Sequence, residues 1–164
     1  MDFDGILQHI IRNSTVNLRS IHGPGHWARV ERNGLFLAPS VGADEQVVSL
    51  FAYFHDCRRL NDGYDPRHGP RAARYVESVR DLLAGLDRTR LATLVEACEG
   101  HTRRRTTDDP TIGVCWDADR LDLPRVGIRP RVKYFHTETA RDMVAARDLS
   151  PLEALEPRTI PSCR

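Results

Sequence analysis

His55 and Asp56 are adjacent in the run FAYFHDCRR, directly behind an apolar face with helical spacing. A polar pair in such a place must be hydrogen-bonded, ion-paired or bound to a metal, because burial removes its hydration. Neighbouring side chains on a helix point about 100° apart, so ordinary helix packing does not bring both into one site. A metal ion at the helix edge could use both, because imidazole nitrogen and carboxylate oxygen both ligate zinc, iron or manganese. The pair therefore indicates a candidate metal site.

Further metal-binding residue types lie at the ends of other expected helices. They are His26 in HWARV, His68 in RHGPRAA, His101 in CEGHT and Asp117 in WDADRLD. Leu94, Cys98 and His101 follow the spacing i, i+4, i+7, so the imidazole continues an inward-facing stripe. A single histidine of this kind is usually a satisfied core residue. Several of them with an inward carboxylate would be costly to bury without a cation, which favours a shared metal centre.

The elements that must position these residues are all expected to be helices. Apolar residues recur at helical spacing, and no convincing alternating strand pattern is present. The expected helices cover residues 3–12, 26–38, 44–58, 69–85, 91–101, 112–121 and 137–147. The sequence therefore predicts an all-α, compact single domain over residues 1–148, followed by a proline-dotted, weakly ordered tail over residues 149–164.

Composition limits the classes of function. The 164 residues contain 24 Lys plus Arg and 23 Asp plus Glu, so the net charge of +1 does not indicate a nucleic-acid or membrane-surface binder. No apolar run approaches 18 residues, and the first residues are acidic where a signal peptide would be basic. The four cysteines, at 57, 98, 115 and 163, form no CxxC and are expected to be reduced thiols of a cytoplasmic protein. The oligomeric state is not indicated.

The order of the donors resembles that of a known family. His26, then His55-Asp56, then the distant Asp117 is similar to the H…HD…D signature of the HD-domain metal-dependent phosphohydrolases. HWARV resembles the first-histidine helix of that family, HGPRAA resembles the HGxxGA helix start of several subgroups, and WDADRLD resembles the segment with the last aspartate. The bare HD dipeptide is a weak signal, whereas four ordered segments with matching flanks are a strong one. The resemblance covers roughly residues 20–125.

The resemblance implies an HD-type helical bundle with a divalent-metal centre between its helices. The first-metal ligands that it implies are His26, His55, Asp56 and Asp117. His68 and His101 match the positions that hold a second metal ion in binuclear members, or they act on substrate or water. The implied cofactor is one or two ions of manganese, iron, nickel or zinc, since the ligand types suit each of these metals.

Three further residues compete for the site. His22 lies four residues before His26, and HxxxH on a helix can chelate a metal, but Gly23, Pro24 and Gly25 interrupt a regular helical turn between them. Asp119 and Asp122 compete with Asp117. We prefer Asp117 as the ligand, because Asp122 lies beyond the matched position and Asp119 is expected to cap a helix or pair with an arginine. His9 and His136 match no motif and are expected at the surface.

Two arginines are candidate substrate contacts. Arg29 follows His26 by one helical turn and could clamp a phosphate, although a salt bridge to a carboxylate explains it equally well. Arg59 follows the His55-Asp56 pair into a loop, where it could contact substrate or simply be solvated. The run Arg103-Arg104-Arg105 could attract an anionic substrate, but a charge run in a loop is usually solvated surface, and we prefer that interpretation.

The function that these observations favour is hydrolysis of a phosphomonoester or phosphodiester bond in a small phosphorylated compound, with a nucleotide as the favoured substrate. A bound divalent metal would lower the pKa of its water toward neutrality and neutralise charge on the phosphate. Two alternatives remain. One is an HD-fold di-iron oxygenase, and the other is a non-catalytic, metal-stabilised module that binds a nucleotide.

Overall fold

The computed structural model describes residues 1–160, and these residues form helices joined by turns and loops. The α-helices are α1 (Phe3–Asn13), α2 (Pro24–Val41), α3 (Glu45–Phe54), α4 (His68–Ser78), α5 (Arg88–Gly100), α6 (Pro110–Arg120), α7 (Glu138–Ala146) and α8 (Ser150–Glu153). Short 3-10 helices are η1 (Arg80–Leu83), η2 (Leu123–Val126) and η3 (Val132–Tyr134). Over the described residues, the predicted all-α fold class is confirmed.

Most of these helices begin at a side chain that accepts hydrogen bonds from the first free backbone N–H groups. The carboxylates of Asp2, Asp44, Asp87 and Asp109 and the hydroxyl of Thr137 make these bonds at α1, α3, α5, α6 and α7. Such caps satisfy donors that have no partner inside the helix, and each typically contributes about 1 kcal/mol. Helix α2 begins differently, with Pro24 in its first turn, where the missing proline N–H costs no hydrogen bond.

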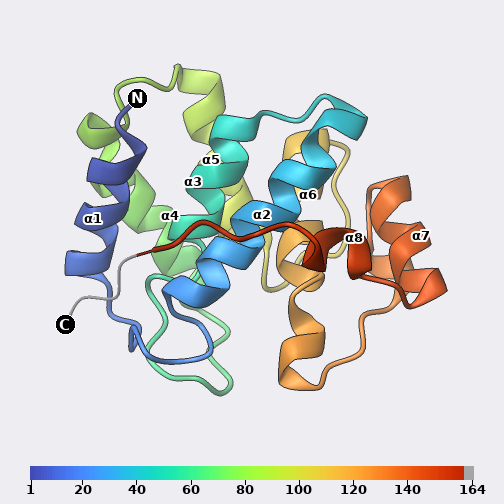
Figure 1. Ribbon diagram of the computed structural model, residues 1–164. Coiled ribbons are helices and arrows are strands. Elements are labelled where there is room, and N and C mark those ends of the chain that lie inside the picture. The colour runs from blue at the N-terminus through green and yellow to red at the C-terminus, as the bar shows by residue number, and fades with distance from the viewer. Residues whose placement is uncertain (161–164) are drawn as a thin grey trace.

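Helix α3 lies at the centre of the bundle. Its residues 47–54 are all buried, and it packs against α2, α5 and α6. Figure 1 shows this central group with α1 on one side and α7 and α8 on the other. A helix that is apolar on every face belongs inside a core. Because α3 ends at Phe54, the chain delivers His55 and Asp56 from the interior of the molecule.

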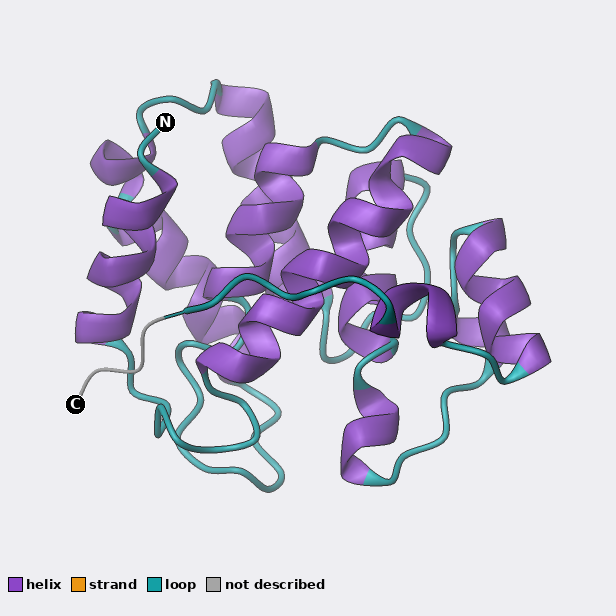
Figure 2. Ribbon diagram, in the orientation of Figure 1, coloured by secondary structure: helices purple, strands orange, loops and turns teal. Residues whose placement is uncertain are grey.

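The loops before α2 and α4 lie together on one side of the bundle, as the teal segments of Figure 2 show. These loops cover residues 14–23 and 55–67. They are joined by two hydrogen bonds, from the amide of Thr15 to the carbonyl of Cys57 (3.0 Å) and from its hydroxyl to the carbonyl of Arg59 (3.0 Å). The ends of α2, α3 and α4 are thereby held next to one another.

Some helix boundaries differ from those that the sequence predicted. The expected helix over residues 69–85 ends at Ser78 and continues as the 3-10 helix η1, because Val79 leaves the helical conformation (φ −111°, ψ 20°). The expected helix over residues 44–58 ends at Phe54, and residues 55–58 form a turn. His9 and His136, expected at the surface, are half-buried: the ring of His9 stacks on Tyr75, and that of His136 meets Trp116 edge-on.

The C-terminal segment is more ordered than its composition predicts. Residues 150–153 form α8, and Leu152 is buried in the core. Arg158 donates to the hydroxyl of Tyr53 (2.8 Å) and pairs with Asp4 (2.6 Å), so the segment crosses the bundle from α8 toward α1 (Figure 1). The expectation of a weakly ordered tail is therefore wrong as far as residue 160. Cys163 lies outside the described residues.

Cys57, Cys98 and Cys115 are buried and form no disulfide. Burial raises the pKa of all three thiols, so little of the reactive thiolate is present at neutral pH. Among the described residues, no helix combines the length and the apolar character that crossing a membrane requires.

Gly34 gives a direct test of the packing at the centre of the bundle. A Cβ added there would overlap Cγ1 of Val48 on α3 and approach Cβ of Ala118 on α6 to 3.4 Å. We expect Gly34→Ala to lower the free energy of unfolding by about 1–3 kcal/mol, because overpacking outweighs the gain in helix propensity. The measurement is urea unfolding. Gly25→Ala on the same helix is the control, since its Cβ would meet only Arg29 Nη1 at 3.6 Å. Equal stability of the two variants would contradict this packing.

Candidate metal centre

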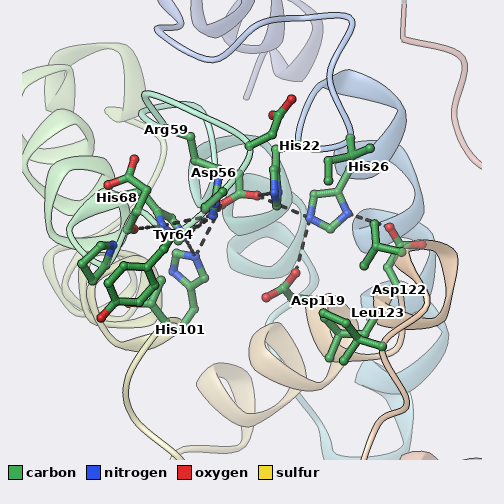
Figure 3. A pocket seen from close by; sticks show the side chains of 18 of the residues that line it. His22, His26, Asp56, Arg59, Tyr64, His68, His101, Asp119, Asp122 and Leu123 are labelled. Carbon is green, nitrogen blue, oxygen red and sulfur yellow. Dashed lines mark hydrogen bonds and ion pairs between the residues drawn. The ribbon is translucent and has the colours of Figure 1, made fainter.

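His26, His55, His68 and His101 converge with Asp56 and Asp119 between the helices on the side where the loops gather. Figure 3 shows His26, His68, His101 and the two aspartates around the cavity. His26 comes from the first turns of α2, His55 directly follows α3, His68 begins α4, His101 directly follows α5, and Asp119 lies on α6. Asp56 follows His55 and lies between the others. All four histidines and Asp56 are buried, and Asp119 is half-buried. Segments up to about 90 residues apart in the sequence thus place metal-ligand atoms in one small volume.

The first group contains His26, His55, Asp56 and Asp119. Nε2 of His26 lies 3.1 Å from Nε2 of His55 and 3.3 Å from Oδ1 of Asp119. Oδ2 of Asp56 lies 3.7 Å from Nε2 of His26 and 3.8 Å from Nε2 of His55. These separations are of the size that ligands of one ion have from each other when each is about 2.0–2.2 Å from it.

The second group contains Asp56, His68 and His101. Nε2 of His68 lies 2.8 Å from Nε2 of His101 and 3.0 Å from Oδ1 of Asp56. Oδ1 of Asp56 is also 3.7 Å from Nε2 of His101. Asp56 therefore presents one carboxylate oxygen to each group, as a carboxylate that bridges two ions would.

The opposite ring nitrogen of each of these histidines is committed to a hydrogen bond. Nδ1 of His26 meets Oδ2 of Asp122 (2.6 Å), Nδ1 of His55 meets the carbonyl of Ala52 (3.0 Å), Nδ1 of His68 meets that of Asp65 (2.6 Å), and Nδ1 of His101 meets that of Cys98 (2.7 Å). A carbonyl or carboxylate oxygen accepts, so each Nδ1 donates. A neutral ring that donates from Nδ1 has its lone pair on Nε2, which is the arrangement of metal-ligating histidines.

The carboxylates and imidazoles of the centre shift one another's pKa values. Burial raises the pKa of Asp56, but His55, His101, His22 and His68 outweigh it and hold that pKa well below its usual value. Burial also raises the pKa of Asp119, but the hydrogen bond from His26 and the charge of the protonated His26 ring outweigh it and lower that pKa. Both carboxylates are therefore ionised at neutral pH.

His26 and His55 have opposite pKa shifts. Burial lowers the pKa of His26, but the hydrogen bonds that its ring donates to Asp119 and Asp122 outweigh burial and raise the pKa to about 9. Burial dominates for His55 and lowers its pKa to about 3. In the metal-free chain at neutral pH, the His26 ring is therefore protonated and the His55 ring is neutral.

These residues fit a divalent metal ion. The Nε2 atoms of His26 and His55 lie 3.1 Å apart, and those of His68 and His101 lie 2.8 Å apart. At such distances their lone pairs repel each other unless a proton or a cation lies between them. The donor atoms are imidazole nitrogens and carboxylate oxygens, which suit manganese, iron, nickel and zinc. The second group has three protein donors. Gly100, which directly precedes His101, cannot be replaced by a further donor without a clash, because a Cβ there would lie 2.6 Å from the Trp116 ring.

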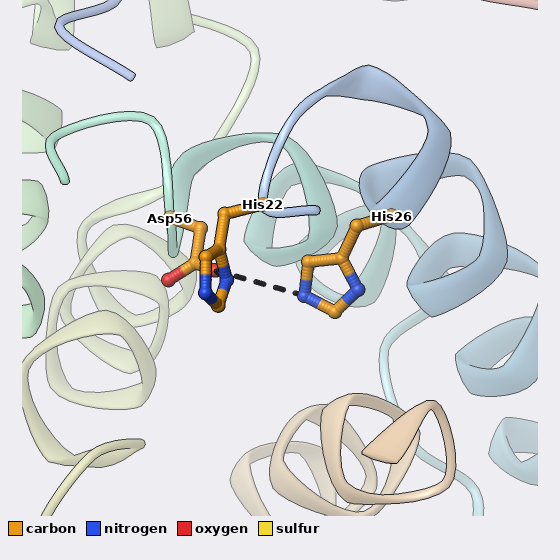
Figure 4. Close-up of side chains that lie close together, drawn as sticks. All are labelled: His22, His26 and Asp56. Atoms are coloured by element: carbon orange, nitrogen blue, oxygen red, sulfur yellow. Dashed lines mark hydrogen bonds and ion pairs between the residues drawn. The ribbon is translucent and has the colours of Figure 1, made fainter. Parts of the chain in front are cut away.

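His22 also lies at the centre, on the loop before α2 (Figure 4). Its Nδ1 is 2.7 Å from Oδ2 of Asp56, and it forms a possible ligand group with His26 and Asp56. Trp27 fixes the loop by donating from Nε1 to the carbonyl of His22 (2.8 Å). The sequence left its role undecided because residues 23–25 break the helix. The structure brings His22 to the site by the fold of the loop and not by helical spacing.

The aspartate of α6 that reaches the centre is Asp119, which corrects our preference for Asp117. The carboxylate of Asp117 instead accepts from the amides of His136 (3.0 Å) and Thr137 (2.8 Å) and from the Thr137 hydroxyl (3.0 Å). It is bound to the segment that precedes α7 and belongs to none of the ligand groups. Periodicity could not decide between the two, because residues 111–118 of α6 are all buried and every face of the helix packs inward.

Arg29 and Arg59 lie in different places. Arg29 donates from Nε to Asp122 (2.8 Å), so it makes the salt bridge that the sequence offered as its alternative role. Arg59 is buried beside the centre, with Nη1 at 3.2 Å from Nδ1 of His68 and 3.6 Å from Oδ1 of Asp56. Its guanidinium borders the second group and the cavity, where it can contact a bound anion.

Asp122 contacts the centre, although we set it aside from the sequence because it lies beyond the matched position. It accepts from Nδ1 of His26 and pairs with Arg29 and Arg125. Burial raises its pKa, but His26 and Arg29 outweigh burial and lower it. Asp122 therefore holds the His26 ring in place.

The centre opens into a cavity of about 480 Å³. His22, His26, Asp56, His68, His101 and Asp119 line its inner part. Arg59, Arg103 and Arg125 border it, and its outer part carries apolar side chains such as Ile21 and Ile128. The cavity can therefore take a small anion against the donors, with further volume for an attached group.

Comparison with solved structures agrees with this fold and site. The chain matches a crystal structure described as a predicted HD superfamily hydrolase from an uncultured Thermotogales bacterium, with a TM-score of 0.67 and 27% sequence identity, over 93% of this chain and 87% of that one. No protein-family model matches the chain, and no curated protein is significantly similar to it. The chain has the all-α fold of the HD superfamily, which confirms the resemblance that the sequence motifs predicted, and the neighbour supports a metal-dependent hydrolase.

Asp119→Asn and Asp117→Asn separate the two aspartates of α6. We expect Asp119→Asn to weaken metal binding at least about tenfold, because a neutral amide replaces a charged donor of the first group. Asp117→Asn is expected to leave the metal stoichiometry unchanged and to lower the unfolding free energy by about 1–3 kcal/mol, since it weakens the bonds to residues 136 and 137. Elemental analysis and urea unfolding measure the two effects. The reverse pattern would restore Asp117 as the ligand.

The raised pKa of His26 predicts how metal affinity depends on pH. A metal ion can bind Nε2 of His26 only after that nitrogen has lost its proton. Because the pKa of His26 is about 9, the ring keeps this proton at neutral pH. We expect the affinity of the metal-free protein for zinc to rise up to about tenfold per pH unit from pH 6.5 to 8.5, with proton release, whereas an ordinary histidine would level off above pH 7. Calorimetric titration in buffers of different ionisation enthalpy measures both quantities. A constant affinity across this interval would contradict the shift.

Proposed function

We propose that the protein is a metal-dependent phosphohydrolase that cleaves an ester bond of a small phosphorylated compound. The observation that carries the proposal is a pair of donor groups, His26–His55–Asp119 and Asp56–His68–His101, at the inner end of a cavity bordered by arginines. The second carboxylate oxygen of Asp56 lies 3.7 Å from Nε2 of His26 and so connects the two groups. Two-metal and one-metal sites of this composition suit displacement at phosphorus. The fold of a predicted HD superfamily hydrolase supports the same class of reaction.

The ligands would have distinct tasks. His26, His55 and Asp119 would hold the first metal ion, with Oδ2 of Asp56 beside them, and Asp56, His68 and His101 would hold a second. A bound divalent metal supplies a Lewis acid for the phosphate and acidifies water near neutral pH. The Nδ1 hydrogen bonds keep the four rings oriented, so the donors need no rearrangement when a cation binds.

The arginines and His22 would act on the substrate. Arg59 is buried beside Asp56 and His68, so its charge is weakly screened and can bind a phosphate oxygen. Arg103 and Arg125 border the same cavity and add positive charge at its side. His22 has the most exposed side chain of the site's histidines, at 17%, and contacts Asp56, which suits it to carry a proton to or from the leaving group.

A di-iron oxygenase is the second candidate. His26, His55 and Asp119 form one donor group and Asp56, His68 and His101 form a second, and imidazole and carboxylate donors of this kind also suit two iron ions. An oxygenase would need iron and would consume oxygen. A phosphohydrolase would work in the absence of oxygen, so anaerobic assays of the iron- and manganese-loaded protein distinguish the two functions.

Asp56→Ala tests the proposed hydrolysis most simply. Because Asp56 contributes to both groups, we expect the variant to retain less than about a tenth of the metal and to lose turnover of phosphate esters by at least about a hundredfold. The measurements are elemental analysis and phosphate release from a panel of nucleotides and sugar phosphates. Asp62→Ala, a change at the outer part of the same cavity, is the control and should keep its metal. Parental turnover by Asp56→Ala would eliminate this mechanism.

A further inference from the structure

The outer part of the cavity differs chemically from its inner part. Three large side chains that line it are unusually exposed: Ile21 at 48%, Tyr64 at 90% and Ile128 at 53%. They come from three separate loops, before α2, before α4 and after η2. Single exposed apolar residues are normal on a protein surface, but a group of them around one cavity indicates a ligand surface. The cavity thus combines a polar end for an anion with an apolar mouth.

Tyr64 is the most exposed of the three, yet the backbone that carries it is held tightly. On one side, the carbonyl of Gly63 accepts from Nη2 of Arg59 (2.7 Å), and the amide of Gly63 donates to the side chain of Asn61 (2.9 Å). On the other side, the carboxylate of Asp65 accepts from the amide of Leu60 (3.0 Å) and pairs with Arg71. The loop therefore presents the ring of Tyr64 from a fixed position while leaving the ring itself free.

The same bonds connect this loop to the ligands. Arg59, which holds Gly63, lies 3.6 Å from Oδ1 of Asp56, and the carbonyl of Asp65 accepts from Nδ1 of His68. The residues on both sides of Tyr64 are thus bonded to groups that touch the metal-binding residues. This fixes the distance between the anion-binding end of the cavity and the aromatic ring at its mouth, as a specificity element requires.

We propose that Tyr64 is a stacking surface for the leaving group, and that the substrate is a phosphate monoester whose leaving group carries a flat ring, as in a nucleoside monophosphate. The inference rests on the proposed function, because it places the phosphate at the ligand groups. All three side chains line the cavity, so a flat ring stacked on the exposed face of Tyr64 would lie in its apolar mouth. A sugar phosphate has no ring face to place there, and its hydroxyls would lose hydration against these apolar side chains.

The test compares two inert probes that differ only in the base. They are the phosphonate analogues of adenosine 5′-monophosphate and of ribose 5-phosphate, in which a methylene replaces the ester oxygen. Their dissociation constants are measured by calorimetry on the manganese-loaded full chain and on its variants Tyr64→Ala, Tyr64→Phe and Leu60→Ala. Leu60 is the matched control, because it is 65% exposed on the same loop and does not line the cavity.

We expect the parent and Leu60→Ala to bind the nucleotide analogue at least about tenfold more tightly than the ribose analogue. Tyr64→Ala should remove this preference, with a loss of about 5- to 100-fold confined to the nucleotide analogue, the range that stacking of a base on an aromatic ring supports. Tyr64→Phe should keep it, since the ring and not the hydroxyl makes the contact. Tyr64→Ala binding like the parent, or a parent that binds the two analogues equally or not at all, would overturn the inference.

Turnover, measured separately, distinguishes this inference from the proposed function. Tyr64-dependent binding of the nucleotide analogue, with no phosphate released from adenosine 5′-monophosphate by any metal-loaded form, would refute the phosphohydrolase and leave the stacking surface standing. Phosphate release with equal KM values in the parent and Tyr64→Ala would support the phosphohydrolase and refute the stacking surface.

Discussion

The repulsion among converging imidazole lone pairs is the constraint on which the centre depends. Pairs of Nε2 atoms lie 2.8–3.1 Å apart, and the flanking carboxylates are ionised. Such an arrangement is unfavourable for neutral rings in a buried volume, and it becomes favourable when positive charge lies between them. In the metal-free chain, a proton on His26 and the guanidinium of Arg59 supply part of that charge. A divalent ion supplies more, which gives a physical reason for metal dependence.

Hydrogen bonds at the helix ends hold the rings in this arrangement. His55 and His101 directly follow α3 and α5, and each donates from Nδ1 to a carbonyl of the last turn of its own helix. Such carbonyls have no partner within a helix, so the same bond satisfies the helix end and turns Nε2 outward. His68 uses the carbonyl of Asp65 before α4 in a similar way. His26 uses the carboxylate of Asp122, whose charge raises the affinity of the ring for a proton or a cation.

Much of the fold and most of the ligand set could be predicted from the sequence. His26, His55, Asp56, His68 and His101 all lie at helix ends, where glycine, proline and the end of apolar periodicity mark a boundary, and the structure brings all five together. Their role as ligands remains a proposal, because it depends on the metal itself.

The remaining parts depend on contacts that local patterns do not contain. Asp117 and Asp119 share a helix that is buried on every face, so spacing could not identify the one that faces the centre. His22 reaches Asp56 through an irregular loop, and Arg29 is directed by Asp122, which lies 93 residues away. The order of the C-terminal segment comes from two residues: Leu152 packs in the core, and Arg158 bonds to Tyr53.

The measurement that tests the central claim most directly is anomalous diffraction from crystals grown with manganese. The account predicts a strong manganese peak bounded by His26, His55, Asp56 and Asp119, with any second peak on the side of His68 and His101. An ordered crystal with these side chains in place and no manganese between them would contradict it.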